Sequence, residues 1–156
     1  MTRKIDALLL EYGESHQNPT NKAVHWICVP TIFWTITALV WSIPVPQALQ
    51  SMPEFNWLMP VLVGVVLYYL ISSWQLAIGI VVFVAACVWG ITFYEVNFTL
   101  PLWQFALGVF VIAWIGQFWG HKIEGKKPSF FKDVQFLLIG PAWLLHFLYK
   151  RFGIRY

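Results

Sequence analysis

Residues 57–94 read WLMPVLVGVVLYYLISSWQLAIGIVVFVAACVWGITFY and contain no side chain that is charged at neutral pH. A helix crosses the hydrocarbon core of a bilayer with about 20 apolar residues, so this stretch is long enough to cross twice. Ser72 and Ser73 divide it and leave barely one turn between the halves. The stretch therefore predicts a tight hairpin of two membrane helices, Trp57–Ile71 and Gln75–Tyr94.

The composition of the whole chain of 156 residues is that of a membrane protein. Hydrophobic residues make up 59% of it, charged residues make up 11%, and ten residues are Trp. Soluble domains carry about 25% charged residues, and a soluble domain of this length has too little interior for so much apolar surface. The same composition excludes a disordered or fibrous chain. We therefore expect residues 1–156 to form one all-α domain, an integral membrane helix bundle, with the lipid bilayer and no nucleic acid as a partner.

Two further stretches are long and apolar enough to cross the membrane, Ala23–Ile43 and Pro101–Trp119. A fifth apolar stretch, Val134–Tyr149, has only 16 residues. Gly140 and Pro141 lie inside it, and we expect them to interrupt a helix there. The sequence thus predicts four transmembrane helices and a fifth helix of a different kind.

The positions of Lys and Arg predict the orientation, because short cytoplasmic loops are enriched in these residues. With four crossings, all ten Lys and Arg residues fall on the side of the N-terminus. A fifth crossing would place Lys150, Arg151 and Arg155 on the opposite side. We therefore expect a cytoplasmic N-terminus and a fifth helix that lies in the interface or re-enters from it, with five spans as the alternative. Residues 1–15 are expected to form an amphipathic arm on the membrane surface.

In this layout the four histidines, His16, His25, His121 and His146, all lie near the cytoplasmic membrane face. Scattered structural histidines have no reason to gather at one depth, whereas metal-binding imidazoles do, because histidine is the commonest metal ligand. The pattern predicts a metal site at this face. For His146 taken alone, a side chain that merely reaches for water is an equal alternative.

Neighbouring polar residues add to the predicted site. Gln117, His121 and Glu124 are spaced four and then three apart, which places them on one face of a helix. An imidazole and a carboxylate at that spacing can bind one metal ion, although Glu124 can equally form a surface ion pair. Asn21 precedes His25 by four residues, so its amide can orient the imidazole.

Two motifs resemble a known family. HQNPTN at residues 16–21, followed by His25 and by VPTI at residues 29–32, resembles the N-terminal signature of the 2-hydroxy fatty acid dioxygenases. QFWGH at residues 117–121, continuing through Glu124 to Lys127-Pro128 and then to Gly140-Pro141, resembles the C-terminal half of the same family.

The resemblance implies a small multi-span Fe(II)-dependent dioxygenase that shortens a 2-hydroxy fatty acid by one carbon with O2. Converting the 2-hydroxy acid to the shorter acid, CO2 and water removes four electrons, the number that reduces O2 fully, so no further reductant is needed. In eukaryotic members this α-oxidation serves sphingoid-base degradation at the endoplasmic reticulum. Because the sequence shows no organelle signal, we expect a bacterial inner membrane, and the endoplasmic reticulum if the source is eukaryotic.

By matching position, the resemblance implies iron ligands at His16, His25 and His121. Eukaryotic members place a glutamate one residue further from the histidine than Glu124 is from His121, and they have a glutamate near the position of His146. Glu124 is accordingly predicted as a catalytic and metal-binding residue together with the three histidines, and His146 as an additional metal ligand.

Lys126 and Lys127 are expected to attract the substrate carboxylate, and Asn21 and Gln117 to support the metal ligands. Two other functions stay open at this stage. One is a membrane protein that carries a b-type haem between histidines, and the other is a non-catalytic transporter or assembly partner. A homo-oligomer is also compatible with the sequence.

Overall fold

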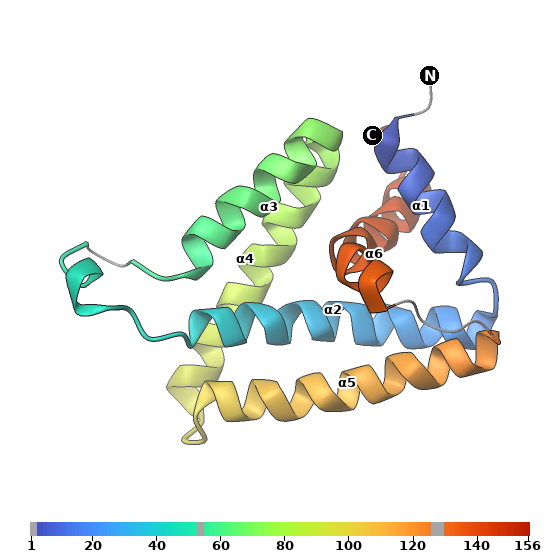
Figure 1. The fold of residues 1–156 in the computed structure, drawn as a ribbon. Coiled ribbons are helices and arrows are strands. Elements are labelled where there is room, and N and C mark those ends of the chain that lie inside the picture. The colour runs from blue at the N-terminus through green and yellow to red at the C-terminus, as the bar shows by residue number, and fades with distance from the viewer. Residues whose placement is uncertain (1–2, 53–54, 126–129) are drawn as a thin grey trace.

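The structure, a computed structural model, describes residues 3–52, 55–125 and 130–156, with the backbone alone for residues 130–136. This part of the chain is all-helical, as the sequence predicts, and Figure 1 shows the arrangement. In chain order its helices are α1 (Lys4–Glu14), α2 (Pro19–Trp41), the short 3-10 helix η1 (Gln47–Leu49), α3 (Leu58–Ser72), α4 (Trp74–Asn97), α5 (Leu102–Glu124) and α6 (Phe130–Arg151).

Three of the described helices, α2, α4 and α5, are long and apolar enough to cross a membrane. The predicted segments match α2 to α5, but α3 has only 15 residues. At 1.5 Å per residue it is about 22 Å long, less than the hydrocarbon core of about 30 Å. α5 continues past the predicted end at Trp119 to Glu124, so that His121 and Glu124 belong to the helix.

The expectation that Gly140 and Pro141 interrupt the fifth helix is wrong, because α6 continues through both residues. A proline inside a helix removes one backbone hydrogen bond, but its own backbone angle is compatible with a helix. Packing offsets that loss here. Ile139, Ala142 and Trp143 on either side of the proline are buried in the core.

α1 packs against α6. Ile5, Leu9 and Tyr12 of α1 are buried in one cluster with residues of α6. The apolar face that the sequence predicts on this arm therefore has a protein partner. α6 is joined in turn to the α3–α4 hairpin, because the Tyr149 hydroxyl donates a hydrogen bond of 2.6 Å to the carbonyl of Gln75.

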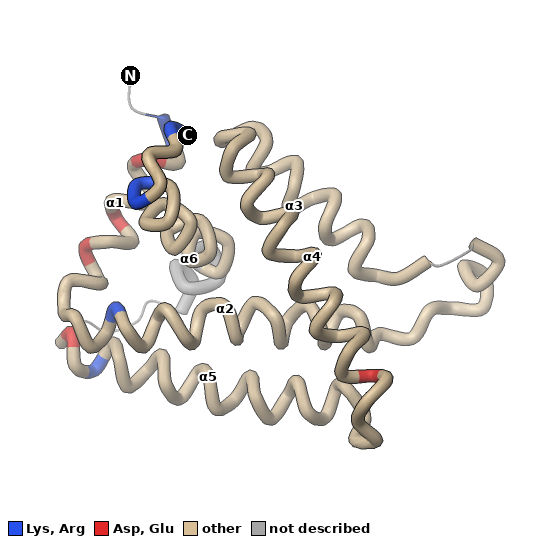
Figure 2. Tube along the Cα trace, turned by 180° about the vertical axis from the view of Figure 1, so that it is seen from behind, with Lys and Arg blue, Asp and Glu red and all other residues tan. Residues whose placement is uncertain are grey.

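α2 and α5 run antiparallel and side by side in both views of the fold (Figures 1 and 2). Gly116 and Gly120 of α5 lie at the contact with α2. A Cβ atom added at Gly120 would lie 2.5 Å from Oδ1 of Asn21, and one added at Gly116 would lie 2.8 Å from Sγ of Cys28. The G-x-x-x-G spacing thus lets the two helices approach closely.

Replacing Gly120 by Ala is expected to destabilise the protein by about 1–3 kcal/mol, because the added methyl group overpacks the α2–α5 contact. The matched control is Gly108→Ala on the same helix, where no neighbouring atom lies within 4 Å of the added Cβ. Helix propensity predicts unchanged or slightly higher stability for that variant. Thermal unfolding in detergent measures both. Equal melting temperatures would contradict the close approach.

In Figure 2 the described basic residues lie in two places, near one end of the α2–α5 pair and at the ends of α1 and α6 that are remote from this pair. They lie at the start of α1, in the first turns of α2, in the last turn of α5, and at the end of α6 and beyond it. At the opposite end of the pair, the described part of the chain carries the acidic residue Glu95 and no Lys or Arg. On α2 and α5 themselves, the basic residues Lys22 and Lys122 thus lie at the same end of the pair.

Candidate metal centre

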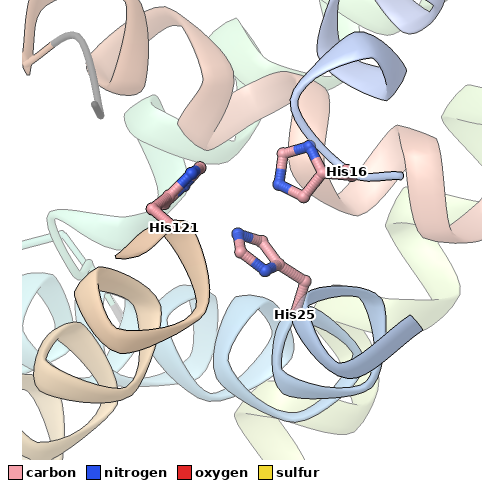
Figure 3. A group of neighbouring side chains, drawn as sticks. All are labelled: His16, His25 and His121. Atoms are coloured by element: carbon pink, nitrogen blue, oxygen red, sulfur yellow. The ribbon is translucent and has the colours of Figure 1, made fainter. Parts of the chain in front are cut away.

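Three histidines meet at the basic end of the α2–α5 pair (Figure 3). His16 lies in the linker between α1 and α2, His25 lies on α2, and His121 lies in the last turn of α5. One nitrogen atom of each ring lies within 4.8 Å of the corresponding atoms of the other two. The ring centroids of His16 and His25 are 4.1 Å apart, and that of His121 lies 5.4 and 5.0 Å from them.

Local sequence fixes where the first two histidines lie. The side chain of Asn18 caps α2 by accepting hydrogen bonds from the backbone N–H groups of Thr20 and Asn21, at 2.9 and 3.4 Å. Pro19 occupies the first helical position, where a missing N–H group costs nothing. α2 therefore begins immediately after the linker that holds His16, and His25 follows in its second turn.

The protonation of two of the rings follows from their hydrogen bonds. Nδ1 of His16 donates to the carbonyl of Tyr12 at 2.6 Å, and Nδ1 of His25 donates to the carbonyl of Asn21 at 2.9 Å. A carbonyl can only accept, so Nδ1 carries the proton in both rings and Nε2 presents a lone pair. This is the arrangement by which proteins orient metal-binding imidazoles.

The two Nε2 atoms are buried without a partner. His16 is 2% exposed and His25 is fully buried, and neither Nε2 atom has a hydrogen-bond partner among the described residues. Leaving a buried polar atom unsatisfied costs free energy, and such atoms in a native structure call for an explanation. A metal ion between the rings would satisfy both lone pairs, so the donor set fits a bound cation.

The electrostatics of His16 also suit a ligand. Burial lowers the pKa of the His16 imidazole to about 4, and the hydrogen bond to Tyr12 and the charge of Glu124 only partly oppose this effect. The ring is therefore neutral at physiological pH. Only a neutral imidazole binds metal, so little proton competition is expected at this position.

Aromatic rings enclose His16. The Tyr12 ring stacks on it with centroids 4.1 Å apart, and Trp143 of α6 lies 5.2 Å from His16 and 5.3 Å from Tyr12. Sequence reasoning missed both aromatic residues. The spacing of four residues between Tyr12 and His16 could have indicated the first, whereas Trp143 reaches the site only through the packing of α6.

Glu124 lies beside the histidines, and its carboxylate accepts three hydrogen bonds. Oε1 accepts from the backbone N–H of Gln17 at 2.8 Å, and Oε2 accepts from that of Asn18 at 2.9 Å and from the Asn21 amide at 3.0 Å. The Asn21 amide also donates to the carbonyl of Ser15 at 3.1 Å. Glu124 thus joins the end of α5 to the linker that holds His16 and to the first turn of α2.

The remaining predicted site residues are placed as follows. The backbone carbonyl of Asn21, and not its amide, holds the His25 ring. Gln117 lies one turn before His121, and its Oε1 is buried with no hydrogen-bond partner among the described residues. His146 of α6 is not one of the three clustered histidines; its Nδ1 is hydrogen-bonded to the Tyr156 hydroxyl. Lys126 and Lys127 lie outside the described residues.

Comparison with known proteins agrees with the motifs. The chain matches the family described as 2-hydroxy-palmitic acid dioxygenase Mpo1-like over residues 2–152. It is 27% identical over 142 residues to the 2-hydroxy-palmitic acid dioxygenase MPO1 of Saccharomyces cerevisiae, an alignment that covers 89% of this chain and 76% of the yeast protein. No solved structure matches the chain. The family match covers nearly the whole sequence and confirms the resemblance: the chain belongs to the Mpo1-like family.

Proposed function

We propose that this membrane protein is an Fe(II)-dependent dioxygenase that α-oxidises 2-hydroxy fatty acids. In the reaction, a 2-hydroxy acid and O2 give an acid one carbon shorter, CO2 and water, which balances atoms and electrons. The observation that carries the proposal is the cluster of three histidines with two buried, unsatisfied Nε2 atoms. It lies in a chain whose family is described as 2-hydroxy-palmitic acid dioxygenase Mpo1-like.

The choice of iron follows from the reaction and not from the ligands alone. Imidazole suits zinc, copper, iron and nickel, so three histidines do not select among them. Zinc has no redox chemistry, whereas oxidation by O2 requires a redox-active metal. When bound, Fe(II) would supply that chemistry, and His16, His25 and His121 would hold it while leaving positions for substrate and O2.

A haem between two of these histidines is a poorer fit. In a b-type site, a flat porphyrin lies between the two axial imidazoles. The ring centroids of His16 and His25 are only 4.1 Å apart and the ring planes are at 81°, which leaves no slot for a macrocycle. A purified protein without a Soret band is the expected outcome.

The chain's own residues orient and shield the site. The carbonyls of Tyr12 and Asn21 hold two imidazoles in the tautomer that presents Nε2. The rings of Tyr12 and Trp143 cover one side of His16 and exclude water from it. Three N–H groups on the Glu124 carboxylate support a positioning role for this residue in place of direct metal binding.

We further propose that the histidine cluster faces the cytoplasm, with α2 to α5 crossing the bilayer and α6 in the inner interface. The position of Lys22 and Lys122 at this end of the α2–α5 pair supports the orientation (Figure 2). Lys126 and Lys127 remain proposed as the residues that attract the substrate carboxylate. The yeast relative supports a eukaryotic membrane as host, alongside the bacterial inner membrane expected from the sequence.

The test is turnover by the full chain in lipid nanodiscs, loaded with Fe(II) under anaerobic conditions. With 2-hydroxypalmitic acid labelled at C1, we expect O2-dependent release of labelled CO2, one CO2 per O2 consumed, and pentadecanoic acid as product. Protein loaded with Zn(II) is the control and should release none. Iron-loaded protein that turns over no 2-hydroxy acid, short or long, would disprove the proposed reaction.

A further inference from the structure

An apolar groove begins next to the histidine cluster. A cavity of about 140 Å³ lies between α2, α4 and α6, where Val29, Pro30, Phe83 and Pro141 are among its lining residues. A second cavity of about 310 Å³ lies further along α2 and α4 and is lined by Trp34 and Ala86, among others. Both cavities share Pro30 and Phe83, so they form one continuous surface, here named the Pro30 groove.

Two prolines within helices line the open space. Pro30 lies inside α2 and Pro141 inside α6, and both line the groove. A proline within a helix removes a backbone hydrogen bond and bends the helix. Both prolines and Phe83 of α4 thus line one space between the three helices.

The near end of the groove adjoins the histidines. His25 and Val29 are four residues apart on α2, so their side chains lie on the same helix face one turn apart. Gly140 closes the other side, because a Cβ added there would lie 3.0 Å from Cγ1 of Val29 and 3.4 Å from the Tyr12 hydroxyl. The apolar surface thus starts at the residues that pack around the cluster.

The far end lies at Trp34 and Ala86. Trp34 follows His25 by nine positions in α2, which corresponds to a rise of about 14 Å along the helix axis. A carbon–carbon bond is about 1.5 Å long and an extended chain advances less than this per carbon, so the groove accommodates about ten carbons. Ala86 is exposed and has the smallest side chain in the lining of this end, which leaves room for a longer tail to continue into the bilayer.

We infer that the Pro30 groove holds the alkyl tail of the 2-hydroxy fatty acid while the carboxyl and hydroxyl carbons lie at the histidine cluster. The inference rests on the proposed function and adds the binding surface for the tail. Ala86 is then a specificity-determining residue, because its small side chain lets tails longer than the groove pass. A bulky side chain at this position excludes long tails and leaves short ones unaffected.

The test compares Ala86→Phe with Ala85→Phe. Ala85 is the preceding residue on α4, is equally exposed, and is not among the residues that line either cavity. Iron-loaded variants in nanodiscs are given a mixture of two 2-hydroxy acids, one with a tail that ends before Trp34 and one with a tail that extends well beyond it. The measurement is kcat/KM for the long acid divided by kcat/KM for the short acid.

For Ala86→Phe we expect this ratio to fall at least tenfold with short-chain turnover retained, and for Ala85→Phe we expect the wild-type ratio. Retained short-chain turnover shows that the variant is folded and loaded. If both variants keep the wild-type ratio, the groove does not hold the tail and the inference is overturned, although the proposed function stands.

A second experiment tests the inference without measuring turnover. A 2-hydroxy fatty acid with a diazirine near the end of its tail is photolysed with the wild-type protein, and the labelled peptides are identified by mass spectrometry. We expect labelling of α4 near Ala86 that unlabelled 2-hydroxy acid displaces. If only a phospholipid with the same diazirine labels this region, and the hydroxy acid displaces none of it, a membrane lipid occupies the groove and the inference is wrong.

Discussion

Replacing His25 by Ala is expected to lower the affinity for Fe(II) by more than a hundredfold and to abolish the release of CO2. The imidazole is fully buried, its Nδ1 is held by the Asn21 carbonyl, and its Nε2 points to the cluster without another partner among the described residues. Removing an outer group that orients a ligand already costs 10–100-fold in metal affinity, so removing the ligand itself costs more.

The matched control is His146→Ala. His146 is hydrogen-bonded to the Tyr156 hydroxyl and is not one of the three clustered histidines. We expect this variant to keep its full metal content. Metal per chain, measured after anaerobic loading and desalting, separates the two outcomes, and helical content by circular dichroism shows whether each variant is folded. Full metal content in His25→Ala would refute the proposed centre.

Replacing Glu124 by Gln is expected to weaken metal binding by 10–100-fold without changing the ligands of the bound ion. The carboxylate accepts three N–H groups, whereas an amide of the same shape has one oxygen and places its own N–H group against a backbone donor. The linker that holds His16 then has a weaker anchor on α5, so the three histidines are less well positioned before the ion binds.

Co(II) distinguishes this role from direct coordination. Its visible absorption spectrum reports the ligand set, so the saturated Glu124→Gln variant should give the wild-type spectrum at a higher Co(II) concentration. A changed spectrum at saturation would show that Glu124 is a ligand. Glu95→Gln, which removes a carboxylate at the opposite end of the α2–α5 pair, is the control and should leave both affinity and spectrum unchanged.

Much of the helical layout follows from the sequence because a helix that crosses the hydrocarbon core needs about 20 apolar residues without charges. Runs without charged residues predict α2, α3, α4 and α5. The helix α2 begins at Pro19, four residues before the predicted span Ala23–Ile43, because Asn18 caps it there.

The predicted span of α5 ends at Trp119, where the apolar run stops. The spacing of Gln117, His121 and Glu124 predicts that the helix continues beyond it, as it does to Glu124. Helices continue beyond the hydrocarbon core wherever water or protein contacts satisfy their ends.

The site was predictable in its histidines and not in the groups that hold them. The predicted topology brought all four histidines to one depth, and the resemblance to the family implied His16, His25 and His121 as ligands, the three that cluster in the structure. The partners of Glu124 include backbone N–H groups more than a hundred residues away in the chain. A hydrogen bond to a backbone N–H group does not depend on the residue type of the donor, so no sequence pattern predicts these partners of Glu124. The position of Trp143 depends on how α6 packs, which no short sequence pattern shows either.

For the proposed centre, the span of chain between His25 and His121 also determines when a metal ion can bind. Two of the three ligands leave the ribosome early, and the third emerges only after the α3–α4 hairpin has been synthesised. A pair of imidazoles binds iron weakly, so a nascent chain captures no ion on the way to the membrane. Loading of the proposed centre is then a late event in biogenesis, which follows the synthesis of α5.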